Sequence, residues 1–191
     1  MLPLAGLIKK YGFANLILYT AAIAFAVIVK IYYRQVESFP GDPAIMLFLK
    51  PLSTIVGLFF GIPFEFDASK GFFNKDINVV IGTSCAGINF FVIVFCMLTF
   101  TFIKLFRSIR QKASAFAAFI TIAYAVSILA NTSRIIAIIS ILDMNLLPAS
   151  LEIGLMHQLT GILFYLVYLI CGFYIAKIIL TKAGFSYEAS S

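Results

Sequence analysis

The sequence predicts an all-α integral membrane protein with about five transmembrane helices and a short extracytoplasmic strand-and-turn segment before the third core helix. Of the 191 residues, 62% are hydrophobic and only 12% are charged, whereas a soluble domain carries roughly 25% charged residues. The mean hydropathy of +1.06 excludes an ordinary water-soluble domain, and a chain this apolar does not stay disordered in water. At ~20 residues per crossing, we expect a single transmembrane domain over residues 1–191.

Five apolar runs predict the helices. They cover residues 15–31, 44–60, 86–106, 115–142 and 157–180. The second run is the weakest, because Lys50 and Pro51 interrupt it. Between the second and third runs, residues 63–84 mix acids, lysines and aromatics, which is typical of an exposed segment of strands and turns.

Basic residues set the expected orientation, because Lys and Arg concentrate in cytoplasmic loops. Four of the 14 Lys and Arg residues lie together at Lys104, Arg107, Arg110 and Lys112. We therefore expect residues 104–114 in the cytoplasm, and residues 63–84 and 143–156 outside it. Five crossings, the preferred arrangement, would place the N-terminus outside despite Lys9 and Lys10. A second run that lies in the interface instead of crossing would remove this conflict.

Three residues of reactive type are predicted to lie at the same depth. Cys85, Arg134 and the single histidine, His157, stand 19, 22 and 20 residues from basic residues that mark the cytoplasmic ends of the last three runs. At a rise of ~1.5 Å per residue these separations are about 28, 33 and 30 Å. The hydrocarbon core is ~30 Å thick. All three residues are therefore expected at the outer boundary, on three different helices.

These residue types together suit nucleophilic catalysis. A helix N-terminus and a nearby cation favour the thiolate of a cysteine, and Cys85 begins the third run behind a Gly-Thr-Ser sequence that can cap a helix. His157 can take the thiol proton and return it to a leaving amine. Arg134 is permanently charged and has five donors for a developing oxyanion. Asn131, one turn away, can orient Arg134 or donate as well.

Each residue also has a structural interpretation. A lone cysteine is more often a packed small residue, and a histidine at a helix end is more often an interfacial anchor. An arginine in an apolar run is usually functional or paired, and Arg134 can pair with Asp143 or Glu152. The other two cysteines lie inside apolar runs and are expected to be buried hydrophobes. We expect no cofactor and no metal ligand.

Three short motifs contain these residues. They are residues 83–90 (TSCAGINF), 131–134 (NTSR) and 157–161 (HQLTG). In order and spacing they resemble the cysteine, Asn-x-x-Arg and His-x-x-x-Gly motifs of the exosortase/archaeosortase family. The resemblance covers residues 44–175, and the short chain is similar to compact forms of that family such as exosortase K. It departs from the family at Ala86, where many members have serine.

The resemblance implies a membrane-embedded cysteine peptidase or transpeptidase at the extracytoplasmic face of the cell membrane. Members recognise the C-terminal sorting tail of an exported protein, which consists of a short motif, a transmembrane helix and a basic cluster. They cut near the motif and transfer the protein to a surface acceptor. Cys85 would correspond to the nucleophile, His157 to the acid/base and Arg134 to the oxyanion or substrate-orienting residue. The supporting residues would be Ala86, through its backbone N–H, with Asn89 and Asn131.

Two other functions remain open, and a third is excluded. A rhomboid-like serine protease would use Ser84, in the pattern Gly82-x-Ser84-x-Ala86, with His157 as base, but it leaves Arg134 unexplained. A non-enzymatic small transporter or assembly factor would use Arg134 to bind an anion or to pair with an acid. Transporters often have repeated halves and broken helices, and neither is evident in the sequence. Nucleic acid is excluded as a partner, because the basic cluster lies between two apolar runs.

Overall fold

The structure, a computed structural model, describes residues 12–143 and 153–185. Its helices are α2 (Phe13–Val36), α3 (Pro43–Phe60), α4 (Ile88–Phe102), α5 (Ile109–Asp143) and α6 (Ile153–Lys182), with short 3₁₀ turns η1 (Thr83–Cys85) and η2 (Ile103–Leu105). Three strands, β1 (Glu65–Asp67), β2 (Gly71–Asn74) and β3 (Val79–Ile81), lie between α3 and η1. Among these residues, five helical segments are long and apolar enough to cross a membrane. The predicted fold class, an all-α multi-pass membrane protein, is confirmed.

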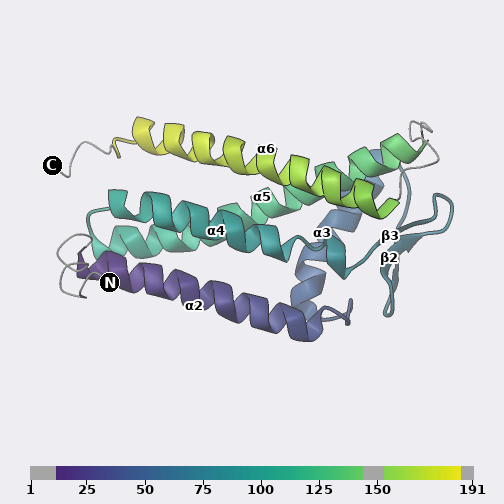
Figure 1. Cartoon of the computed structure of the whole chain (residues 1–191), viewed down its shortest axis with the longest axis horizontal. Helices are drawn as coiled ribbons and strands as arrows, with labels where there is room; N and C mark the ends of the chain where they lie inside the picture. The colour runs from purple at the N-terminus through teal and green to yellow at the C-terminus, as the bar shows by residue number, and fades with distance from the viewer. Residues whose placement is uncertain (1–11, 144–152, 186–191) are drawn as a thin grey trace.

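Four helices run along the long axis of the molecule, with the sheet and α3 at one end (Figure 1). The start of α2, the α4–α5 connection and the end of α6 lie together at the other end (Figure 1). Contacts fix this arrangement, because Nζ of Lys112 donates to Oδ1 of Asn15, and the rings of Phe106 and Phe185 lie 4.8 Å apart. The basic residues around 104–112 therefore lie at the same end of the molecule as the start of α2 and the end of α6.

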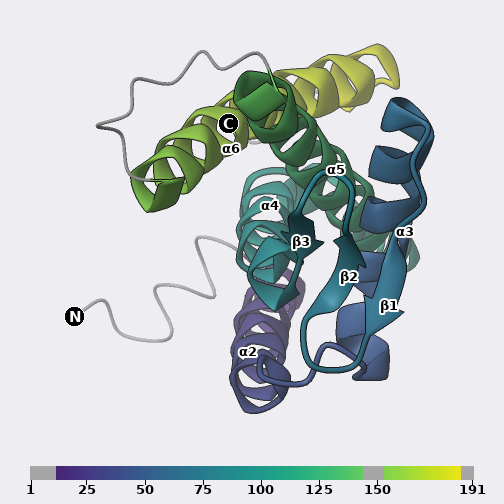
Figure 2. The same ribbon diagram turned by 90° about the vertical axis from the view of Figure 1, so that its right-hand side faces the viewer.

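Helix α3 runs across the direction of the other four helices in both views (Figures 1 and 2). Its 18 residues measure only about 27 Å along their own axis, so α3 extends a shorter distance along the common direction. By length and composition alone α3 could cross the membrane. Its transverse direction instead favours the alternative in which this segment lies in the interface, at one end of the other helices. The start of α2 lies at the same end as the basic loop (Figure 1), as expected for the arrangement in which the second run does not cross.

Pro51 does not interrupt α3, because α5 supplies the missing hydrogen bond. Proline lacks the N–H that would donate to the carbonyl four residues earlier, which is that of Leu47. The hydroxyl of Tyr124 on α5 donates to this carbonyl at 2.7 Å. At the ends of α3, Asp42 caps the N-terminus by accepting from the N–H of Ala44, and Gly61 ends the helix in the left-handed conformation.

The sheet confirms the predicted strand-and-turn segment and leads directly to Cys85. Its antiparallel strands have the order β1-β2-β3, and β2 is mostly buried while β3 continues through Gly82 into η1. At the β1–β2 turn, Asp67 accepts from the hydroxyl of Ser69, which lowers the pKa of that carboxyl. Gly71 is required because its φ is +97° and a Cβ there would lie 2.6 Å from the carbonyl oxygen of Ile81.

Helix α4 is the most buried helix, and α6 is the most exposed of those described. The side chains of Phe95, Leu98 and Phe102 on α4 have at most 1% of their surface exposed, whereas apolar residues of α6 such as Leu163 are 60% exposed. A helix that is apolar on every side lies either in a core or in lipid. The exposed apolar surface of α6 is therefore the surface expected of a lipid-facing helix.

The direction of α3 gives a topological prediction. In a variant without native cysteines, we expect Lys70→Cys to react with an impermeant maleimide on intact cells, because it lies at the sheet end. Arg110→Cys and Phe13→Cys should react only after permeabilisation, since both positions lie at the basic end. Labelling of Phe13→Cys from outside would instead mean that α3 crosses the membrane, and labelling of Arg110→Cys from outside would reverse the orientation.

The bond between Tyr124 and Leu47 gives a second prediction. Tyr124→Phe leaves the Leu47 carbonyl without a donor, and we expect a loss of about 1–3 kcal/mol in the free energy of unfolding. In a Pro51→Ala background the loss should be smaller, because the alanine N–H now donates to the same carbonyl. Unfolding of the four variants in mixed detergent micelles gives the coupling free energy. Equal losses in both backgrounds would contradict this account.

Candidate functional site

Cys85 and Arg134 line one open cavity of about 530 Å³. Its walls come from the end of the sheet, η1, α5 and the first turns of α6. The polar or small lining residues are Ser84, Cys85, Arg134, Gln158, Gly161 and Tyr165. The cavity lies at the sheet end of the molecule, since β3 leads into η1. Two of the three residues expected at one depth therefore border a common space.

Cys85 ends the short turn η1 and precedes α4 instead of lying in its first turn. Its N–H donates to the carbonyl of Gly82 at 2.9 Å, and only 8% of the residue surface is exposed. The N-cap of α4 is Gly87, without a side-chain capping bond, so the expected cap from Thr83 or Ser84 is not formed. Ala86 is fully buried and its N–H donates to the carbonyl of Thr83 at 3.0 Å. This N–H is therefore already engaged.

Gly87 packs directly against α5, and no other residue fits there. Its φ is +71°, and a Cβ at this position would overlap Nδ2 of Asn131. The hydroxyl of Ser127 donates to the carbonyl of Gly87 at 3.0 Å. Asn131 is fully buried, and its Nδ2 donates to the carbonyl of Ser127 at 2.8 Å. The segment that carries Cys85 is thus held on α5 by a close backbone approach.

The guanidinium of Arg134 is positioned by Tyr165 of α6. Nη1 of Arg134 donates to the Tyr165 hydroxyl at 3.0 Å, and this hydroxyl donates to Oδ1 of Asn131 at 2.7 Å. The Tyr165 ring stacks on Phe90 of α4, with centroids 4.5 Å apart and an interplanar angle of 11°. Arg134 is 8% exposed, and its Nε has no hydrogen-bond partner in the described part of the chain.

Tyr165 was not among the residues predicted from the sequence. A signal for it exists, because His157, Gly161 and Tyr165 recur every fourth residue and so fall on one face of a helix. Asn131 was predicted to orient Arg134 or to donate as well, and the structure shows that the two residues share the Tyr165 hydroxyl as a hydrogen-bond partner. Its amide hydrogen bonds lie within the network of α5 and α6.

Other predicted residues lie outside the cavity or outside the described residues. Asn89 is exposed and accepts from Nζ of Lys30 on α2, so the structure does not bring it to the cavity. His157 lies on α6 one turn before Gly161, but its side chain is outside the described part, as are the side chains of Asp143 and Glu152. Among the described residues, no group of three or more His, Cys, Asp and Glu side chains could hold a metal ion.

Comparison of the chain with protein-family models, with curated proteins and with solved structures finds no match.

The close approach of Gly87 to Asn131 gives a third prediction. Gly87→Ala places a side chain at positive φ and against a buried amide, so we expect it to lower the free energy of unfolding by about 1–3 kcal/mol. Gly172→Ala on α6 is the matched control. A Cβ at Gly172 meets nothing within 4 Å, and alanine favours a helix. Unfolding in mixed micelles tests both, and equal stability of the two variants would contradict the packing described here.

Proposed function

We propose that this chain is a membrane-embedded cysteine peptidase or transpeptidase that processes the C-terminal sorting tails of exported proteins. The observation that carries the proposal is the common cavity of Cys85 and Arg134, at the end of the helices opposite the basic loop. Arginine within an apolar helix is costly and is usually retained for a function. The motif resemblance and the cavity point to the same two residues independently.

Cys85 is proposed as the nucleophile and His157 as the acid/base. The residue after His157, Gln158, lines the cavity, and so does Gly161 one turn later. The start of α6 therefore borders the space beside the thiol. Ser84 also lines this cavity and is the nucleophile required by the serine-protease alternative, so the experiment below includes it.

Arg134 is proposed to stabilise the oxyanion of the tetrahedral intermediate. The Tyr165 hydroxyl accepts from Nη1 of the guanidinium. Arg134 also borders the cavity, so other N–H groups of the guanidinium are proposed to donate to the oxyanion. Donors fixed before the reaction stabilise developing charge without reorganising. Because the N–H of Ala86 is engaged in η1, Arg134 becomes the principal oxyanion donor in the proposal.

The proposed reaction proceeds through a thioester. The Cys85 sulfur attacks the scissile carbonyl carbon, and its proton passes to His157. The oxyanion then collapses, the C–N bond breaks, and His157 returns the proton to the leaving amine. Water, an amine or a hydroxyl attacks the thioester and restores the Cys85 thiol. The substrate tail can approach through lipid, since Ile162 lines the cavity and is 65% exposed.

The experiment uses the full chain in cells together with an exported reporter that carries a candidate sorting tail. Cys85→Ala should abolish cleavage of the reporter, and Cys85→Ser should be nearly as damaging because a hydroxyl is a much weaker nucleophile at neutral pH. Cys96→Ala and Cys171→Ala are the matched controls and should leave cleavage unchanged. Cleavage that survives in Cys85→Ala but is lost in Ser84→Ala would assign the reaction to a serine protease.

Variants of Arg134 test the oxyanion role in the same assay. Arg134→Lys keeps the charge but loses the planar array of donors, and we expect the cleavage rate to fall by a factor on the order of 10²–10³. Tyr165→Phe keeps the stacked ring and the guanidinium but removes the hydrogen bonds of the hydroxyl to Arg134 and Asn131, so the rate should fall less. Membrane insertion and thermal stability are measured for each variant. A normal rate in Arg134→Lys would contradict the proposed role.

A further inference from the structure

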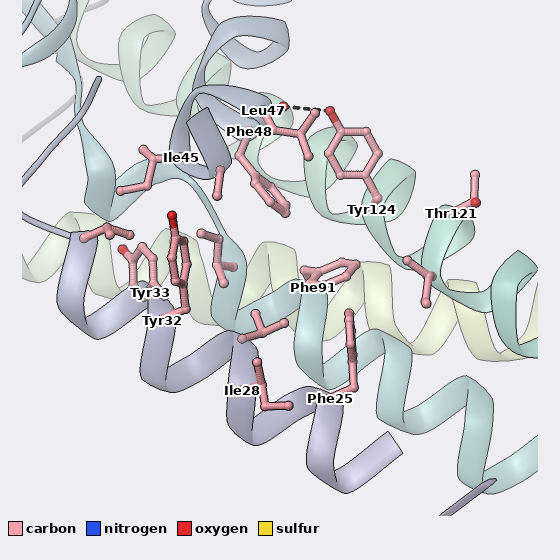
Figure 3. Close-up of a pocket in the computed structure, with 15 residues that line it drawn as sticks. Phe25, Ile28, Tyr32, Tyr33, Ile45, Leu47, Phe48, Phe91, Thr121 and Tyr124 are labelled. Atoms are coloured by element: carbon pink, nitrogen blue, oxygen red, sulfur yellow. Dashed lines mark hydrogen bonds between the residues drawn. The ribbon is translucent and has the colours of Figure 1, made fainter. Parts of the chain in front are cut away.

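A second cavity, of about 620 Å³, lies between α2, α3, α4 and α5 and is called the aromatic crevice here. Figure 3 shows side chains from these helices pointing into it. Phe90 of α4 stacks on α6 beside the Cys85 cavity, whereas the next residue, Phe91, lines the crevice. Helix α4 therefore separates an apolar crevice from the polar cavity that contains Cys85.

The crevice is long and runs along α2. Its lining residues on that helix are Phe25, Ile28, Val29, Tyr32, Tyr33 and Val36, which form one face over twelve residues, a rise of about 17 Å. This face begins near the middle of α2 and reaches its last residue, at the sheet end. Since the hydrocarbon core is ~30 Å thick, the crevice spans the depth of about one leaflet.

The crevice offers no free hydroxyl to an occupant. Tyr33 donates to the carbonyl of Thr83, and Tyr124 donates to that of Leu47 (Figure 3). The other two hydroxyls also have partners, because Tyr32 donates to Asp42 and Thr121 to Ala117. A cavity without polar partners does not hold water.

The remaining surface of the crevice is apolar, and its aromatic rings lie next to one another. Phe25 meets Phe91 edge to face with ring centroids 6.2 Å apart, and Phe48 meets Phe91 in the same way at 5.7 Å. Tyr124 extends this row, with its centroid 5.2 Å from that of Phe48. Rings from all four helices thus form one wall (Figure 3), which is suited to a hydrocarbon.

We propose that the acyl chain of a membrane phospholipid, from the leaflet at the sheet end, occupies the aromatic crevice. A transmembrane helix about 10 Å wide would fill a volume of this size with only about one and a half turns. A single hydrocarbon chain is thinner and can extend along the whole face of α2. The occupant would pack against Tyr33, which donates to the carbonyl of Thr83 in η1, and so would support the segment that carries Cys85 from behind.

The chain contains no tryptophan, so one introduced tryptophan gives a clean fluorescence signal. Phe48→Trp places it on the crevice wall, with Ile28→Trp as a second reporter. Phe102→Trp is the matched control, because Phe102 is fully buried and packs on Phe173 of α6. The full chain is purified in dodecyl maltoside and titrated with phosphatidylcholine that carries dibrominated acyl chains. We expect saturable loss of fluorescence from both crevice reporters and none from Phe102→Trp.

A filling substitution shows whether the lipid enters the crevice. Ala44 lines it, and Ala44→Leu combined with Phe48→Trp should abolish the saturable loss of fluorescence. Ala24→Leu, on an exposed position of α2, should leave it unchanged. The proposal is overturned if the crevice reporters are quenched no more than Phe102→Trp, or if saturable quenching persists in Ala44→Leu. Recovery of the fluorescence on addition of a leucine-alanine transmembrane peptide, but not on addition of unbrominated phosphatidylcholine, would mean that the crevice binds a helix. That result would also overturn the proposal.

Discussion

The buried amide of Asn131 is the interaction on which the candidate site depends. It approaches Gly87 so closely that no side chain fits there, and it accepts from the same Tyr165 hydroxyl that binds Arg134. One side chain thus sets both the turn that follows Cys85 and the position of the guanidinium. In a medium of low polarity such a network is strong when complete and costly when one member is missing. A change at Asn131 would therefore affect both sides of the cavity together.

The sequence predicted the class of fold and much of the site because lipid imposes strict requirements. A span needs about 20 apolar residues and satisfied backbone groups, so hydropathy locates the helices, and the mixed composition of residues 63–84 locates the sheet. Distances counted from basic residues along helices also placed Cys85 and Arg134 at one end, where they share a cavity. These predictions rest on properties of a single segment or on its length.

What the sequence did not predict depends on contacts between segments. A transverse helix and a crossing helix have the same composition, so the direction of α3 follows only from its packing on α5 and the sheet. The role of Tyr165 depends on partners more than 30 positions away in the chain. The N–H of Ala86 was expected to be available, but the tight turn of η1 uses it. Apolar patterns also do not reveal where four helices leave a crevice.

Pro51 has a consequence for how α3 finds its place. Two apolar helices can often slide past each other by one turn, about 5.4 Å, and still bury similar surfaces. The missing N–H of Pro51 creates one backbone acceptor in α3 that the helix itself cannot satisfy, and Tyr124 supplies a donor that reaches it at 2.7 Å. Only one axial register and one rotation of the pair bring the two groups together. The residue that weakens the hydropathy signal thus selects a single alignment from several of similar energy.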